Sequence, residues 1–214
     1  MSVAEQAYAF AKERILDGRY TGGELISEGD VAAGVGVSRT PVREAFLRLE
    51  TEGLLRLYPK RGALVVPVSA AEVESVMETR LLVEQFAIEK VIRSQTDLGS
   101  KPREAITRQE ELAACDDERN FVETDREFHR IFVAAAGNPI LLQLHDSLRD
   151  RQSRMMLAAL ARDADRLQQV LQEHRSLADA VEAGDADAAR SLLDTHLHGT
   201  LALLRSASKL LELK

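Results

Sequence analysis

One amphipathic helix, expected over residues 38–49, constrains the fold of this chain more than any other segment. Ser38 is a favourable N-cap, and Pro41 falls in the first turn, where its missing N–H costs no helical hydrogen bond. The apolar side chains that follow are spaced at i, i+3, i+4 and i+7 and share one face: Val42, Ala45, Phe46 and Leu49. The open face near the N-terminus carries three charged side chains: Arg39, Arg43 and Glu44.

The flanking sequence places this helix in a small unit with a hairpin. Residues 27–30 have capping-box spacing and begin a shorter helix, and the turn at 34–36 is the tight corner between the two helices. Downstream, two β-prone runs, 54–58 and 63–68, enclose a basic turn at 59–62. We therefore predict a helix-turn-helix followed by a wing, and expect this unit to bind double-stranded DNA.

The net charge of −7 agrees with such a unit once it is divided along the chain. Residues 1–68 hold nine Lys and Arg and nine Asp and Glu, so they are neutral. The rest of the chain holds the other 19 basic and 26 acidic side chains, from totals of 28 and 35. A neutral unit with a local basic face suits sequence-selective binding better than coating of DNA through charge alone.

This N-terminal part resembles the GntR family of bacterial transcription regulators. The matching sequences are VSRTPVREAFLRLETEGLL and PKRGALV, within a likeness that covers residues 3–68. The resemblance implies operator contacts from the recognition helix: Ser38, Arg39, Thr40 and Arg43. It also implies that Arg61 and Gly62 of the wing enter the minor groove. Gly29 stands where some relatives carry a basic residue, so no contact is carried over to that position.

Composition and cysteine usage indicate a cytoplasmic protein without membrane segments. The charged fraction of 29% and the hydrophobic fraction of 45% are ordinary for globular proteins. The single cysteine, Cys115, excludes an intramolecular disulfide framework and fits a reducing compartment. No apolar run reaches the ~18 residues of a membrane helix, and we expect no signal peptide.

From Ser69 onward the pattern is helical throughout, and Ser69 itself caps a new helix without a long linker. The predicted helices are 69–93, 102–116, 119–136, 139–160, 163–183 and 186–210. Short connections between them predict an all-α antiparallel bundle. The expected fold class is thus mainly α, with a winged helix-turn-helix domain at 1–68 and a helical domain for effector binding and dimerisation at 69–214.

Polar side chains interrupt the apolar faces of three of these helices. Asp125 and His129, spaced i and i+4, share the inward stripe of the helix at 119–136, and His174 and His196 lie on the apolar faces of the last two helices. A buried carboxylate is costly unless it is paired or bound to a cation. This set suits a divalent transition metal, zinc first and nickel, iron(II) or manganese next. The alternative is that each histidine is a core residue bonded to a backbone carbonyl.

Arg80 and Glu84 are two further charges on a buried stripe. Arg80 could hold the carboxylate of an effector in a bidentate pair, with Glu84 orienting it, or the two could form a structural ion pair. His145 is the substitute metal ligand, although a role behind the ligands or at a dimer contact is favoured. His198 shares its face with polar residues and is expected to be solvated.

The second half resembles the FCD ligand-binding domain of the FadR subfamily of GntR regulators, over residues 69–205. The matching residues are METRLLVE at 77–84, DREFHRIFVAAAGNP at 125–139, EHRSLADAVEAGDADAA at 173–189, and His196. The resemblance implies a metal held by Asp125, His129, His174 and His196, with an organic or sugar acid beside it. A count of six helices is similar to the smaller, VanR-like branch.

Two classes of function follow from these patterns. The favoured one is a homodimeric transcription regulator, a repressor by family analogy, that binds a palindromic operator and responds to a small carboxylic acid. The alternative is a metal-dependent enzyme that uses the Asp/His₃ site, although no nucleophile motif or separate general base accompanies it. A purely architectural helical bundle would leave the recognition helix unexplained.

Overall fold

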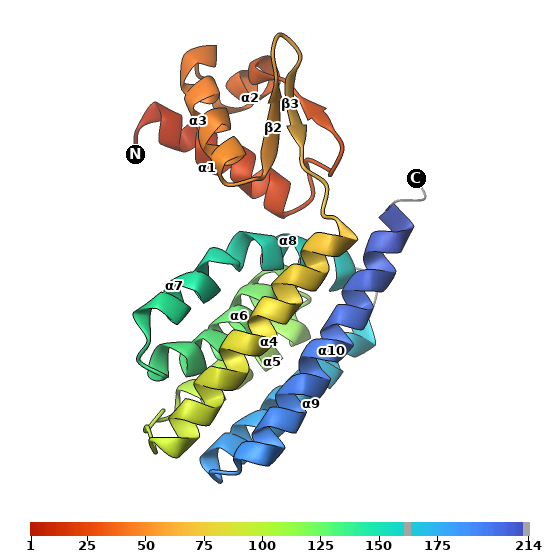
Figure 1. Cartoon of the computed structure of the whole chain (residues 1–214). Helices are drawn as coiled ribbons and strands as arrows, with labels where there is room; N and C mark the ends of the chain where they lie inside the picture. The colour runs from red at the N-terminus through yellow and green to blue at the C-terminus, as the bar shows by residue number, and fades with distance from the viewer. Residues whose placement is uncertain (161–163, 212–214) are drawn as a thin grey trace. The chain divides into compact units, whose positions relative to one another are not determined.

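The computed structural model describes residues 1–160 and 164–211, which divide into two compact units, Met1–Val68 and Ser69–Lys214 (Figure 1). The first unit combines three helices with a small sheet, and the described part of the second is built from helices. The expected fold class, a winged helix-turn-helix followed by a helical bundle, is confirmed. None of the helices among the described residues is long and apolar enough to cross a membrane.

The first unit has its elements in the order of a winged helix. They are α1 (Val3–Leu16), β1 (Leu25–Ile26), α2 (Glu28–Val35), α3 (Arg39–Thr51), β2 (Leu55–Tyr58) and β3 (Gly62–Val65). The three strands form one antiparallel sheet in the order β1-β3-β2. The strand β1 was not predicted, because two residues are too few for a hydrophobic alternation to appear in the sequence.

The predicted apolar face of α3 forms the centre of this unit's core. Val42, Ala45, Phe46 and Leu49 are all buried, and they belong to one cluster with buried residues of α1, α2 and the sheet. The helix begins after Ser38, as expected, but the Ser38 side chain makes no capping hydrogen bond among the described residues. Packing of the apolar face therefore contributes more to the position of α3 than its cap does.

Glycines allow two close approaches in the winged unit. Gly36 ends α2 in the left-handed conformation, with φ 77°, and makes the tight corner before α3. Gly62 follows the wing turn with φ 103°, and a Cβ there would lie 2.3 Å from the carbonyl oxygen of Ile26. The wing therefore requires glycine at this position for both its conformation and its space.

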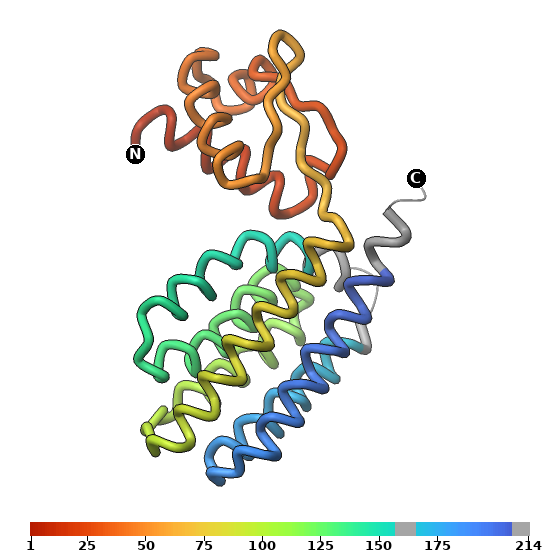
Figure 2. The backbone as a smooth tube through the Cα atoms, viewed as in Figure 1, coloured from red at the N-terminus to blue at the C-terminus, as the bar shows by residue number. Residues whose placement is uncertain are grey.

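The second unit contains seven helices in its described part. They are α4 (Ala70–Arg93), α5 (Lys101–Ala114), α6 (Glu118–Ala135), α7 (Pro139–Ser147), α8 (Arg149–Leu160), α9 (Ala164–Glu182) and α10 (Ala186–Leu211). Ser69 caps α4 by accepting a hydrogen bond from the backbone of Glu72. The long helices α4 and α10 run antiparallel side by side, as the ribbon and the backbone tube both show (Figures 1 and 2).

One expected helix is wrong: the segment predicted as a single helix at 139–160 is divided at Leu148. The backbone N–H of Leu148 bonds to the carbonyl of His145, three residues back, which closes a tighter turn than the α-helix has. Leu148 is buried, so tertiary packing accompanies the break. No Gly or Pro marks it, and the count of six helices was therefore one too low.

Candidate metal centre and nucleic-acid interface

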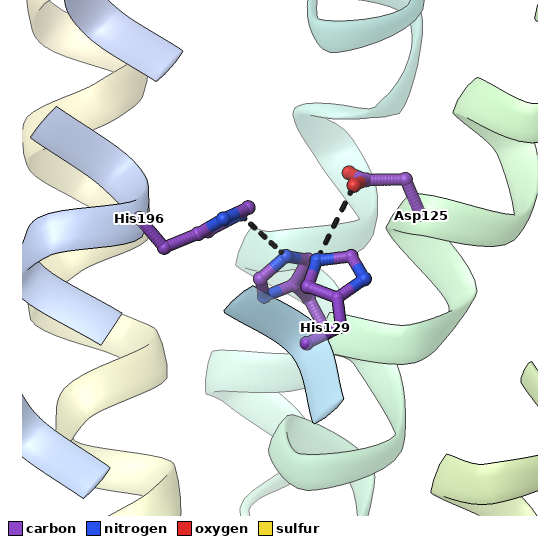
Figure 3. A group of neighbouring side chains, drawn as sticks. Asp125, His129 and His196 are labelled. Atoms are coloured by element: carbon purple, nitrogen blue, oxygen red, sulfur yellow. Dashed lines mark hydrogen bonds and ion pairs between the residues drawn. The ribbon is translucent and has the colours of Figure 1, made fainter. Parts of the chain in front are cut away.

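Helices α6, α9 and α10 bring the four predicted metal ligands to one point in the helical unit. Asp125 and His129 lie one turn apart on α6, and His174 and His196 come from α9 and α10. All four side chains are buried, and one ligand atom from each lies within 4.8 Å of the others. In Figure 3 the side chains of Asp125, His129 and His196 point toward one another.

The spacing of the donor atoms suits a metal ion. Nε2 of His129 lies 3.2 Å from Nε2 of His196, and Nε2 of His174 lies 3.5 Å from Oδ1 of Asp125. Two nitrogens that share a zinc at about 2.0–2.1 Å in a tetrahedral arrangement are about 3.3 Å apart. Nε2 of His174 is buried without a hydrogen-bond partner among the described residues, and it lies in the cluster of candidate donor atoms.

The other ring nitrogen of each histidine faces a side-chain oxygen. Nδ1 of His129 lies 2.8 Å from Glu84 Oε2, Nδ1 of His174 lies 2.8 Å from Gln109 Oε1, and Nδ1 of His196 lies 2.6 Å from Glu173 Oε2. An Nδ1–H that donates to an oxygen, as at His174 and His196, leaves the Nε2 lone pair for a metal. The contact of His129 with Glu84 is close, but it lacks the geometry of a hydrogen bond. None of these three partners is a backbone carbonyl, which was the expected partner of an ordinary core histidine.

Burial keeps two of these imidazoles neutral, the form that binds a metal. Burial, followed by the neighbouring His196 and His129, holds the pKa of His174 well below its usual value. Burial also lowers the pKa of His196, against the opposing effect of its hydrogen bond to Glu173. With their donor atoms converging and two of the imidazoles neutral, the four residues form a candidate site for a metal ion.

Arg80 and Glu84 form a buried ion pair on α4. Nε of Arg80 donates to Oε1 of Glu84 over 2.7 Å, and the second carboxylate oxygen faces His129. Burial alone would raise the pKa of Glu84, but Arg80, His129 and His145 together outweigh it, and the pKa lies well below its usual range. Glu84 thus joins Arg80 to a candidate metal ligand.

The remaining histidines occupy different environments. His145 is buried on α7 with Nε2 3.4 Å from Glu84 Oε1, so it lies behind Glu84 and outside the group of four donor atoms. His198 is exposed, as expected, and its Nδ1 bonds to the backbone carbonyl of Asp194. Gln109 and Glu173 were not predicted as functional residues, and the only signal for Glu173 in the sequence is its place directly before His174.

A cavity of about 600 Å³ lies elsewhere in the helical unit, where the ends of α4 and α9 meet the start of α5. Its lining includes Val91, Pro102 and Glu182, and none of the predicted ligand residues. No buried charged side chain among the described residues lines it. The chemistry of the helical unit is therefore concentrated at the histidines.

In the winged unit, the six predicted DNA contacts occupy two places. Ser38, Arg39, Thr40 and Arg43 are exposed in the loop before α3 and in its first turns. Arg61 is exposed in the β2–β3 turn, directly before Gly62. Arg43 is bonded to Glu28 of α2, at 2.9 and 3.0 Å. A Cβ on Gly29 would lie 3.4 Å from Nη2 of Arg39. The guanidinium of Arg39 therefore lies against α2 at Gly29, the position where some relatives carry a basic residue.

Comparisons with known proteins agree with both units. Residues 3–65 match the family described as bacterial regulatory proteins, gntR family, and residues 75–199 match the FCD domain. The chain belongs to the GntR family of transcription regulators. Within it, the FCD domain places this regulator in the FadR-like group, and all four candidate ligands lie in the matched FCD range.

Similar GntR regulators include two with named operons. A protein from Paenarthrobacter nicotinovorans, named "Probable D-xylose utilization operon transcriptional repressor", is 31% identical over 92% of this chain and 86% of its own length. The gluconate operon transcriptional repressor of Bacillus licheniformis is 27% identical over 81% of this chain and 73% of its own. A solved GntR structure from Rhodococcus sp. RHA1 superposes with a TM-score of 0.80 at 26% identity, covering 97% and 99% of the two chains.

These relatives are regulators of transcription, not enzymes, so the chain is a DNA-binding transcription regulator. The enzymatic alternative has no support among them.

Proposed function

We propose that this GntR regulator binds a short palindromic operator as a homodimer, represses transcription, and responds to a small organic or sugar acid bound beside a metal. The observation that carries the proposal is the convergence of four buried donor atoms, with Nδ1 of His174 and Nδ1 of His196 bonded to side-chain oxygens. As a DNA-binding protein, the regulator would act in the cytoplasm.

The DNA contacts of the proposal come from the start of α3 and the wing. Arg39 and Arg43 project from the exposed N-terminal turns of the helix that would enter the major groove, where Ser38 and Thr40 also lie. Arg61 and Gly62 lie at the wing tip, which would contact the minor groove. The α3 side chains would read bases and phosphates, while the wing would add contacts beside them.

The metal of the proposal is held by Asp125, His129, His174 and His196. Zinc is the first candidate, because three imidazoles and a carboxylate form a usual ligand set for it, and nickel, iron or manganese are alternatives. When bound, the metal would supply a Lewis-acid position to which an oxygen of the effector could bind. Glu84, Gln109 and Glu173 would hold the three imidazole rings in orientation.

The effector of the proposal is a carboxylic acid recognised in part by Arg80. The charge of Asp125 acts on Arg80, which indicates that its guanidinium lies near the metal ligands. Glu84 occupies Nε of Arg80, and an effector carboxylate would bind the terminal NH₂ groups. The operon names of two relatives, D-xylose utilization and gluconate, support a sugar acid as the first class to test.

The homodimer of the proposal would form through the helical unit. The four large hydrophobic side chains that are most exposed in its described part lie on two helices that contact each other, α4 and α7: Leu82, Phe86, Ile140 and Leu144. Exposed apolar side chains gathered in this way are typical of interfaces. A second copy of the chain is the partner that a palindromic site requires, because each winged unit would bind one half-site.

The test is the metal content of the purified protein, compared between wild type, His196→Ala and His198→Ala. The two histidines are on the same helix, but only His196 is among the converging ligands, whereas His198 is exposed. We expect about one transition metal per chain in the wild type and in His198→Ala, and much less in His196→Ala. A wild-type protein that takes up neither zinc nor nickel on reconstitution would contradict the proposal.

A further inference from the structure

Arg43 of α3 is held by Glu28, the first residue of α2. Nε of Arg43 donates to Oε1 of Glu28 at 2.9 Å, and Nη2 donates to Oε2 at 3.0 Å. The Arg43 side chain is 68% exposed and that of Glu28 is 25% exposed. The bidentate pair therefore fixes the stem of a side chain whose far end is open to solvent.

The way in which Glu28 binds leaves half of the guanidinium free for another ligand. A guanidinium has five N–H donors, and Glu28 uses one on Nε and one on Nη2. The second N–H of Nη2 and the two of Nη1 form the outer edge. This is the edge with which an arginine can donate two parallel hydrogen bonds to O6 and N7 of a guanine in the major groove.

The same turn of α2 also supports the other arginine of the recognition helix. Nη2 of Arg39 would be 3.4 Å from a Cβ at Gly29, so its guanidinium lies directly against the α2 backbone. The absence of a side chain at Gly29 leaves this place open. The first turn of α2 thus acts as a support for two arginines of α3.

We propose that Glu28 is a positioning residue for the reading of a guanine by Arg43. By holding the inner edge of the guanidinium, it presents the outer edge to the base and reduces the side-chain entropy lost on binding. Its carboxylate also repels phosphates, which disfavours contacts of Arg43 with the backbone of non-cognate DNA. This inference rests on the proposed function, because it requires a specific operator.

The experiment uses the full chain and a site chosen by the wild-type protein from random DNA duplexes about three helical turns long. Each guanine pair in that site is then replaced in turn, and the affinities of the wild type and of Arg43→Ala are measured. The guanine read by Arg43 is the one whose replacement weakens binding of the wild type but not of Arg43→Ala. Affinities are then measured for the selected site, for the site without that guanine, and for random-sequence DNA. Glu28→Gln is compared with Asp30→Asn, which removes the same charge from the same turn of α2 and whose carboxylate bonds to Ser27 instead.

We expect Glu28→Gln to weaken binding to the selected site by about tenfold. Binding to the site without the guanine should change much less, and binding to random DNA should be unchanged or stronger. Asp30→Asn should discriminate among the three duplexes as the wild type does. In an Arg43→Ala background, Glu28→Gln should have no further effect on discrimination, which links the loss to this pair.

Full discrimination by Glu28→Gln would overturn the inference, and so would an equal loss on all three duplexes. Circular dichroism and thermal unfolding of the variant show whether an equal loss has its origin in folding. If the wild type selects no sequence at all, the proposed function fails and the inference fails with it. If the wild type selects a site and Glu28→Gln discriminates among the duplexes as well as the wild type does, only the inference about Glu28 fails and the proposed function stands.

Discussion

At the scale of single residues, the partners behind the histidines distinguish the candidate metal centre from an ordinary core. Gln109 is fully buried on α5, and its Oε1 accepts from Nδ1 of His174 in a contact that spans 65 positions of the chain. This hydrogen bond directs the other nitrogen of the ring to the ligand cluster. In the proposed metal centre, Gln109 would therefore orient a ligand without binding the metal itself.

We predict that Gln109→Leu weakens metal binding by about 10–100-fold while most of the fold is retained, because the Nδ1 partner is lost but the volume is nearly conserved. The measurement is competition for zinc with a chromophoric chelator, and the exposed Gln143→Leu is the control. Unchanged zinc affinity in the Gln109 variant would remove this residue from the site.

We predict that Arg43→Ala weakens binding to the selected operator by about tenfold or more, because a bidentate contact to a base edge is lost. Arg48→Ala is the matched control, since it removes an exposed arginine from the other end of α3, where the side chain bonds to Glu52. Fluorescence anisotropy with a labelled duplex measures both variants. Similar losses in the two would assign to Arg43 a general electrostatic role only.

At the scale of elements, the wing shows how one glycine determines the path of a strand. Gly62 pairs with Tyr58 at the end of the hairpin while β1 passes so close that no Cβ fits beside the Ile26 carbonyl. The turn before it contains Lys60 at φ 66°, an uncommon conformation for a side chain other than glycine. The wing tip is thus a defined structure rather than a loose loop.

Gly62→Ala should destabilise the winged unit by roughly 1–3 kcal/mol, because a positive φ and a backbone clash act at the same residue. Gly23→Ala provides the comparison, since Gly23 also has a positive φ, of 87°, but its Cβ would meet no atom within 4 Å. Urea unfolding gives both free energies. A loss for Gly62→Ala no larger than that for Gly23→Ala would show that the clash with β1 is relieved.

The division between α7 and α8 is the element that helix periodicity could not predict. Leu141, Leu148 and Met155 keep seven-residue helical spacing across the break, and neither Gly nor Pro occurs between them. At the break, the backbone N–H of Leu148 bonds to the carbonyl of His145, three residues back, and the Leu148 side chain is buried. Local propensity is weaker than such packing, so the sequence favoured one continuous helix.

At the scale of the whole molecule, the proposed dimer requires a face that is apolar in the single chain. Phe86 on α4 is 45% exposed, and Leu82 one turn earlier is 72% exposed. A glutamate in an apolar interface must lose its hydration without a partner, which makes association unfavourable. This gives the dimer a test that is independent of the metal.

We therefore expect Phe86→Glu to convert the dimer to a monomer at micromolar concentration, as measured by analytical ultracentrifugation. Gln169→Glu, which adds the same charge to an exposed position on α9, should leave the dimer intact. Operator affinity should fall when the dimer is lost, because a single winged unit contacts only one half-site. A Phe86→Glu protein that remains dimeric would place the contact on another face.

The sequence by itself determined which side chains face inward. The 3.6-residue period places Asp125 and His129 together on one stripe, and it places His174 and His196 on the apolar faces of two other helices. The recognition helix and the wing were predictable for the same reason, since the caps, turns and apolar spacing that specify them lie within about 30 consecutive residues. These features were predictable because each depends on residues close together in the chain.

Only the tertiary structure decided where those inward faces meet and what stands behind them. The Nε2 atoms of His129 and His196 are 3.2 Å apart although 67 positions separate the two residues. Gln109 and Glu84 reach the histidines from α5 and α4, and Glu28 reaches Arg43 from α2. Such contacts depend on the angle and rotation at which helices pack, which arise from the summed fit of many side chains and have no periodic trace in the sequence.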